Sequence, residues 1–125
     1  MKSLILTTAA LSLMATMSSA QPTIATKTDI GAVLAAEKNG LTLYTFAKDK
    51  PGISKCSGAC ADAWPPFIAS GVTSSDDGSK LIKRADGQMQ WANAKGMPLY
   101  FWAGDSKRGQ TSGDGVGGVW KVARP

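Results

Sequence analysis

The chain contains no histidine and only two cysteines among its 125 residues. Without histidine, it lacks the side chain that most often serves as a general base in enzymes. The serines lie in turn-like contexts such as Ser57-Gly58, with no nucleophile-elbow motif around them. The glycine-rich segment 113–118 lacks the Lys-Ser/Thr pair of a phosphate-binding P-loop. These absences argue against an enzyme, so we expect a noncatalytic protein.

The chain also lacks a dense run of one charge. It carries 14 Lys and Arg against 9 Asp and Glu, and its longest basic clusters are pairs such as Lys83-Arg84 and Lys107-Arg108. A surface that binds nucleic acid requires a concentrated basic stripe. We therefore expect no nucleic-acid partner.

The first 20 residues have the pattern of a signal peptide. Lys2 precedes an apolar stretch over residues 4–17, and Ser18-Ser19-Ala20 offers small residues for cleavage before Gln21. The stretch is short for a membrane span, no second apolar run follows it, and no cysteine there could receive a lipid. We expect export to the periplasm or the medium, with a mature chain of residues 21–125 and no transmembrane segment.

An internal repeat dominates the mature chain. Residues 40–49 (GLTLYTFAKD) return as residues 96–105 (GMPLYFWAGD), and equivalent positions stay 56 residues apart as far as Trp64 and Trp120. One copy of such a unit cannot bury its apolar face alone, so two copies imply one shared core. We expect a single domain over residues 21–125, with repeats at about 28–70 and 84–125.

Local patterns predict a β-hairpin in each copy. Asn39-Gly40 is a favoured turn pair between an apolar segment at 33–36 and a β-rich segment at 41–46. The second copy repeats this layout with segments 88–92 and 97–102. Side chains alternate along a strand, and the second strand of each copy carries large apolar groups on both faces, so we expect these strands to be buried on both sides.

The fold class that follows is mainly β. We expect a small single domain of two pseudo-repeated β-hairpin units with long loops, cross-linked by one disulfide. A helical turn is expected over residues 58–63, ending before Pro65-Pro66 because proline cannot continue a helix.

Three residue types recur in register and form a repeat motif. They are Tyr44, Asp49 and Trp64 in the first copy and Tyr100, Asp105 and Trp120 in the second. An Asp just past a strand commonly caps a turn by accepting backbone N–H bonds, so we interpret the aspartates as structural rather than as a catalytic pair. The constant Tyr-to-Asp spacing predicts a tyrosine hydroxyl near the loop of its own repeat, and the tryptophans are expected at equivalent places in the core.

Cys56 and Cys60 are the only cysteines. In an exported protein, an even pair is read first as a disulfide, here one that pins the irregular segment leading to Trp64. A redox-active pair and a copper-binding dithiol are the alternatives, since thiolates and thioethers suit Cu(I). The spacing excludes c-type haem, and zinc would need more ligands. We expect no cofactor and no metal, with the two cysteines as secondary metal candidates.

The motifs, taken in order, resemble those of the secreted repeat family of exported bacterial proteins and lipoproteins, defined by a Tyr-x4-Asp motif and without an established function. The resemblance rests on LYTF through Asp49, CSGAC followed by WPP, RADG, PLYFW through Asp105, and GVGGVW at residues 115–120. It covers nearly all of the mature chain. It implies a fold and an exported location, but no reaction. The lipidation cysteine of many relatives is missing, so membrane anchoring is not implied.

The role that these observations favour is a noncatalytic periplasmic binding or interaction module. Its partner would be a periplasmic protein or an envelope component, met by the loops 50–60 and 106–118 as a variable surface. The alternative is a redox or copper-handling accessory protein that uses the Cys56/Cys60 pair.

Overall fold

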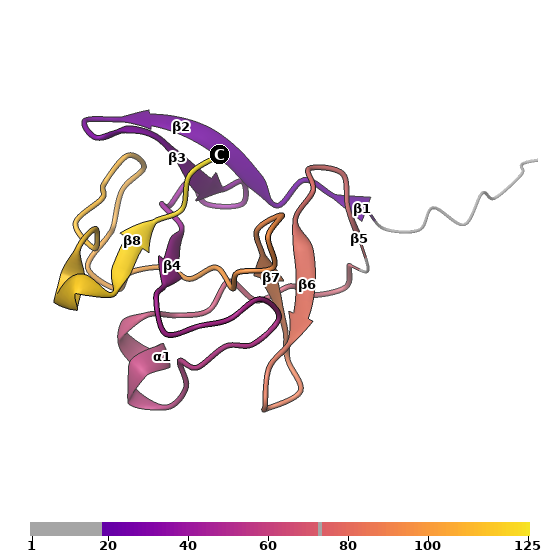
Figure 1. Ribbon diagram of the computed structural model, residues 1–125. Helices are drawn as coiled ribbons and strands as arrows, with labels where there is room; N and C mark the ends of the chain where they lie inside the picture. Colours follow the sequence, from indigo (N-terminus) through magenta and orange to yellow (C-terminus); the bar gives the residue numbers. More distant parts are fainter. Residues whose placement is uncertain (1–18, 73) are drawn as a thin grey trace, which may run out of the picture.

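The computed structural model describes residues 19–72 and 74–125 (Figure 1). The expected signal peptide at residues 1–20 lies outside the described residues, apart from Ser19 and Ala20. In the part of the chain that is described, no helix is long and apolar enough to cross a membrane.

Each copy begins with an antiparallel hairpin. In the first copy, β2 (Thr23–Thr28) pairs with β3 (Gly31–Ala36). In the second, β6 (Lys80–Lys83) pairs with β7 (Met89–Ala92). The sequence patterns predicted β3 and β7 but not β2 and β6, because these two strands carry many Thr and Lys side chains at exposed or half-exposed positions.

The two copies complete their pairing with each other. Strand β4 (Tyr44–Phe46) of the first copy pairs antiparallel with β8 (Trp120–Val122), which ends the second copy, and the two lie side by side in Figure 1. In the same way, Tyr100 of the second copy bridges to Pro66 near the end of the first. The repeats are therefore interlocked through their strands.

Tyr44 and Tyr100 also pair directly. The Tyr44 N–H donates to the Tyr100 carbonyl at 2.8 Å, and the Tyr100 N–H donates to the Tyr44 carbonyl at 3.0 Å. Because these residues occupy equivalent positions, a pseudo-two-fold axis passes between them.

The tyrosine strands separate two apolar clusters. Tyr44 and Tyr100 belong to a cluster that contains the tryptophans Trp64 and Trp120, whereas the preceding Leu43 and Leu99 belong to the other. All four of these tyrosine and leucine side chains are fully buried. The predicted burial on both faces is therefore confirmed for both segments, although only the first forms a strand, β4 over Tyr44–Phe46, whereas segment 97–102 forms isolated bridges at Pro98 and Tyr100.

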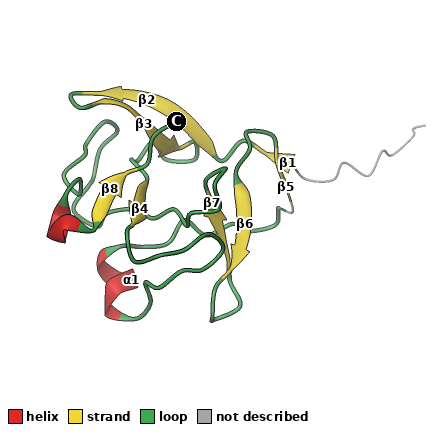
Figure 2. Ribbon diagram, in the orientation of Figure 1, coloured by secondary structure: helices red, strands yellow, loops and turns green. Residues whose placement is uncertain are grey.

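The remaining elements are short, and loops make up much of the fold (Figure 2). Helix α1 (Ala59–Ala63) confirms the helical turn expected before the prolines. The other elements are β1 (Ser19–Ala20), β5 (Ser74–Ser75) and a 3-10 turn over Val116–Gly118. The expected class, mainly β with two repeats and one disulfide, is confirmed.

Candidate functional site

Four aromatic rings form a stack across the pseudo-two-fold axis. Trp64 and Trp120 lie parallel at the centre, with ring centroids 3.8 Å apart and an angle of 3° between the planes. Trp102 covers Trp64 and Phe46 covers Trp120, each at 4.2 Å. The two tryptophans are only 4 % exposed, so the equivalent positions expected from the repeat meet in one core. Such ring pairs contribute stability beyond the area that they bury.

The tyrosine hydroxyls donate to aspartates of the opposite repeat. Tyr44 Oη donates to Asp105 Oδ2 at 2.5 Å, and Tyr100 Oη donates to Asp49 Oδ2 at 2.6 Å. The prediction that each hydroxyl lies near the loop of its own repeat is therefore wrong. Because Tyr44 and Tyr100 pair through their backbones, each side chain instead meets the loop that follows the other strand.

The second oxygen of each carboxylate caps a loop, as the sequence predicted. Asp49 Oδ1 accepts from the Lys55 N–H at 2.6 Å. Asp105 Oδ1 accepts from the Ser112 N–H at 3.2 Å and from the Ser112 hydroxyl at 2.6 Å. Each aspartate thus ties a loop of its own repeat to a tyrosine of the other.

Burial shapes the protonation of these groups. It raises the pKa of Tyr44 and Tyr100 well above the usual value near 10, and the hydrogen bonds to the carboxylates raise it further. Burial also raises the pKa of Asp49, although hydrogen bonds from Tyr100 and from the Lys55 N–H oppose that shift. Both tyrosines therefore stay protonated at neutral pH and act as hydrogen-bond donors.

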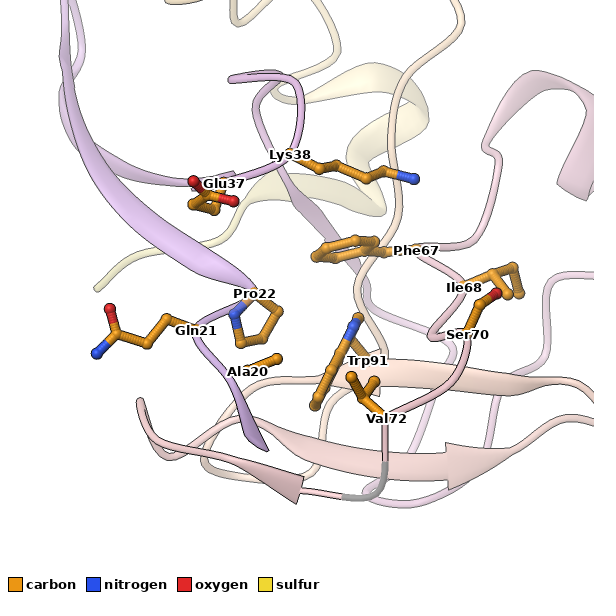
Figure 3. Close-up of a pocket in the computed structure, with 10 residues that line it drawn as sticks. All are labelled: Ala20, Gln21, Pro22, Glu37, Lys38, Phe67, Ile68, Ser70, Val72 and Trp91. Carbon is orange, nitrogen blue, oxygen red and sulfur yellow. The ribbon is translucent and has the colours of Figure 1, made fainter. Parts of the chain in front are cut away.

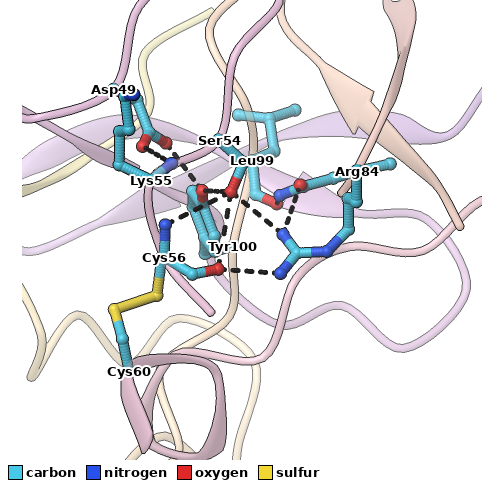
Figure 4. The surroundings of a disulfide bond; sticks show 9 residues. Asp49, Ser54, Lys55, Cys56, Cys60, Arg84, Leu99 and Tyr100 are labelled. Carbon is cyan, nitrogen blue, oxygen red and sulfur yellow. Dashed lines mark hydrogen bonds between the residues drawn. A yellow bond between two sulfur atoms is a disulfide. The ribbon is translucent and has the colours of Figure 1, made fainter. Parts of the chain in front are cut away.

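A buried arginine completes the Tyr100 site (Figure 4). Arg84 is 8 % exposed, and its guanidinium donates to Ser54 Oγ at 3.0 Å, to Gln90 Oε1 at 2.8 Å and to the Cys56 carbonyl at 2.7 Å. Ser54 lies 2.6 Å from Tyr100 Oη and is the donor, because the Tyr100 proton is directed at its aspartate. A single direction of donation therefore runs from Arg84 through Ser54 and Tyr100 to the carboxylate.

No sequence pattern marks Arg84 or Gln90 as a member of a site. Arg84 belongs to one of the scattered basic pairs, and Gln90 lies within the expected strand segment 88–92. Gln90 is fully buried and donates through Nε2 to the Leu99 carbonyl at 2.7 Å. A polar residue inside an otherwise apolar strand was the available signal, because buried polar side chains need hydrogen-bond partners.

The cysteines form the disulfide Cys56–Cys60. The Cys56 carbonyl accepts from Arg84, and the Cys60 carbonyl accepts from the Trp64 N–H at 2.8 Å. The bridge therefore fixes the segment that carries both contacts, in line with the expected local role. Within residues 19–72 and 74–125, no group of three or more His, Cys, Asp or Glu is placed to hold a metal ion.

A hollow of about 350 Å³ opens beside the second apolar cluster (Figure 3). Phe67 and Trp91, each 3 % exposed, form its apolar side together with Val72. Lys38 lies at the rim with its Nζ 5.6 Å from the centre of the Phe67 ring, next to Glu37. An aromatic surface with a few charged groups beside it is the usual composition of a small binding site. No local sequence pattern predicts this hollow, because its residues come from separate segments.

The N-terminal segment forms one wall of the hollow through Ala20, Gln21 and Pro22. The Pro22 carbonyl accepts from the Glu37 N–H at 2.9 Å. The next residue, Thr23, donates through its N–H and its hydroxyl to Asp77 Oδ2 at 3.0 and 2.7 Å. Hydrogen bonds therefore attach this wall to Glu37 and, through the next residue, to Asp77.

Two comparisons find no match: no curated protein and no solved structure matches the chain. A family model described as a secreted repeat of unknown function matches residues 24–68 and again residues 80–124. The two matches begin at β2 and β6, the first strands of the two hairpins, and agree with a periplasmic or secreted location. Since they cover more than half of the chain, the protein belongs to this family of secreted repeats of unknown function.

Proposed function

We propose that the protein is an exported, noncatalytic binding module, and that the hollow beside Phe67 and Trp91 holds its ligand. The observation that carries the proposal is a hollow of about 350 Å³ whose apolar side is formed by the largely buried rings of Phe67 and Trp91, with the charged Lys38 and Glu37 at its rim. Export would follow cleavage of the predicted signal peptide before Gln21.

The chemistry of the tyrosine–aspartate pairs supports a noncatalytic role. The hydroxyls and carboxylates that could act as acids or bases are buried and bonded to one another. A catalytic acid or base must come within hydrogen-bond reach of a substrate, which these buried groups do not offer. Each aspartate also holds a backbone N–H of segment 50–60 or 106–118, so these loops serve the internal network. The hollow is therefore a better binding site than the two loops.

The test is a ligand screen on the purified mature protein by two-dimensional ¹H–¹⁵N NMR. We expect shifts to cluster at Phe67, Trp91 and Lys38. Ser70 is exposed at the edge of the hollow, so Ser70→Trp should block binding, whereas Ser57→Trp, at an exposed site elsewhere, should not. Chemical conversion of a ligand, or shifts unchanged by Ser70→Trp, would contradict the proposal.

The alternative function is a redox or copper-handling accessory protein. The supporting observation is that Cys60 is only partly buried, whereas Cys56 is fully buried. The reduction potential of the Cys56–Cys60 pair separates the two roles. A value below about −300 mV is typical of structural disulfides and supports the binding module, whereas a value well above it supports the alternative.

A further inference from the structure

We infer that, after cleavage, the place of β1 at the wall of the hollow receives the carboxyl-terminal end of an extended peptide whose last residue is small and apolar. The peptide lies along β5, and its carboxylate meets the α-amino group of Gln21. This inference rests on the proposed function and on cleavage after Ala20.

In the uncleaved chain, strand β1 already occupies the position proposed for the peptide, which we call the seat. Strand β1 runs parallel to β5, with Ser19 opposite Ser74 and Ala20 opposite Ser75. The Ala20 carbonyl accepts from the Asp76 N–H at 2.8 Å. Ala20 also packs against the apolar cluster and lines the hollow beside Trp91 (Figure 3). The seat therefore accepts an extended backbone that ends in a small apolar residue.

Cleavage vacates this seat and changes its charge. Hydrolysis of the Ala20–Gln21 peptide bond consumes one water and leaves a carboxylate on the released segment and an ammonium group on Gln21. β1 leaves with that segment, so β5 presents the edge to which β1 was paired. Exposed strand edges bind extended peptides through backbone hydrogen bonds, and side-chain pockets add specificity.

Cleavage places an ammonium group where the carboxylate of the peptide would lie. The Gln21 ammonium and Lys38 are the cations beside the vacated seat, while Glu37 lies at the rim and Asp76 and Asp77 follow β5. A peptide carboxylate would restore the junction that cleavage opened, with the Asp76 N–H placed to donate to it as it does to the Ala20 carbonyl.

The two residues that follow the α-amino group are held in place before a peptide arrives. Pro22 is bonded to Glu37, and Thr23 donates twice to Asp77. Burial alone would raise the pKa of Asp77, but hydrogen bonds from Ser79 and Thr23 outweigh it and hold the pKa below its usual range. Asp77 therefore stays ionised at neutral pH and continues to accept both bonds, which lowers the cost of ordering on binding.

The experiment uses the mature protein, with its N-terminus verified by intact mass. The probe is the N-acetylated tetrapeptide Met-Ser-Ser-Ala, the sequence of residues 17–20, with a free carboxylate. Its control is the same peptide as a carboxyl-terminal amide. By calorimetry, we expect the acid to bind at least about tenfold more tightly than the amide, equivalent to about 1.4 kcal/mol.

A second pair of samples tests the α-amino group. An N-terminal glutamine can cyclise to pyroglutamate and lose its positive charge, whereas Gln21→Ala keeps a free amine and cannot cyclise. We expect the Gln21→Ala protein to prefer the acid over the amide and the cyclised protein to lose that preference. Equal affinity for acid and amide in the Gln21→Ala protein would overturn the inference.

Other outcomes identify other occupants. If benzoate binds and the peptide does not, the hollow is a site for small aromatic anions. If the protein dimerises as its concentration rises and the dimer covers the hollow, the occupant is a second copy. Each result would overturn the peptide inference. If screened compounds shift Phe67 and Trp91 but the peptide acid does not bind, the proposed function survives and only this inference fails.

Discussion

The two tyrosine–aspartate pairs are related by the repeat, yet they are completed in different ways. Around Tyr44, the Gly113 N–H donates to the hydroxyl at 3.2 Å, and the glycine backbone lies directly against aromatic rings. Around Tyr100, the partner is Ser54, which receives a hydrogen bond from the buried Arg84. Duplication has therefore preserved the hydroxyl–carboxylate pair while the surrounding packing has diverged.

The same divergence appears one strand away. Val33 faces Thr26 in the first hairpin, and Gln90 faces Ile82 at the equivalent place in the second. Both Val33 and Gln90 are fully buried, but Val33 packs in the aromatic cluster whereas Gln90 bonds to Arg84. At this place, apolar contacts surround the tyrosine of the first repeat, whereas a hydrogen-bonded network surrounds the tyrosine of the second.

Removal of Arg84, which supports the site around Tyr100 in the second repeat, should lower the stability of the protein most strongly. Arg84→Met leaves the Cys56 carbonyl, Ser54 and Gln90 without their charged donor, and bonds from charged groups contribute about 1.5–3 kcal/mol each. We expect a loss of about 4 kcal/mol in the free energy of unfolding, measured by urea denaturation. Lys83→Met, which removes the same charge from an exposed neighbour, should change stability by less than about 0.5 kcal/mol. Equal effects would refute a network role for Arg84.

Addition of one methyl group at Gly113 should disrupt the packing around Tyr44 in the first repeat. A Cβ at Gly113 would lie 2.8 Å from Trp64 Cη2 and 2.9 Å from both Trp102 Cγ and Tyr44 Cε1. Because overpacking a filled core costs about 1–3 kcal/mol, Gly113→Ala should lower the free energy of unfolding by about 2 kcal/mol. Ser57→Ala at the equivalent exposed position is the control and should be nearly neutral. An unchanged Gly113→Ala midpoint would show that this packing is loose.

Alkaline pH should destabilise the two tyrosine–aspartate pairs equally. The pKa of each tyrosine is raised in the folded state, so its stabilisation is complete below pH 10 and is lost as the pH rises above that value. Two such groups predict a fall of about 2.7 kcal/mol per pH unit. Tyr44→Phe and Tyr100→Phe should each halve that slope in denaturation series above about pH 11, where the tyrosines of the unfolded chain are almost fully ionised. A slope unaffected by one of them would mean that this tyrosine ionises freely.

Double-mutant cycles should resolve which residues are paired. We expect a coupling of about 1 kcal/mol between Tyr44→Phe and Asp105→Asn, and between Tyr100→Phe and Asp49→Asn, because each pair shares a hydrogen bond. The cycle between Tyr44 and Asp49, in one repeat, should show coupling near zero. The reverse pattern would mean that each tyrosine bonds within its own repeat.

The sequence was sufficient to predict β3, β7 and the two-sided burial of the tyrosine segments, but not that β3 and β7 form their hairpins with β2 and β6. Alternation placed Leu43 and Tyr44 on opposite faces, and the structure buries them in different clusters. It was not sufficient to predict the crosswise bonds, because a repeat of fixed spacing is satisfied equally by contacts within a copy and between copies. That choice depends on the backbone pairing of Tyr44 with Tyr100, a contact between residues 56 positions apart.

The role of Arg84 and the hollow could not be predicted from the sequence for the same physical reason. Arg84 has the sequence appearance of a surface cation, and only the surrounding fold brings three acceptors to its guanidinium. Likewise, the hollow needs Phe67, Trp91 and the N-terminal segment to converge, which no local pattern records.

The pairing of Tyr44 with Tyr100 gives the linker around residues 70–78 a definite task. One repeat alone lacks the partner for its tyrosine hydroxyl and for the Oδ2 atom of its aspartate, so a free half-chain would have to find a second half by diffusion. A short covalent connection replaces that search with an effective concentration on the order of millimolar. The domain can thus be viewed as a dimer of half-units joined by one covalent connection, which keeps the halves matched at any dilution.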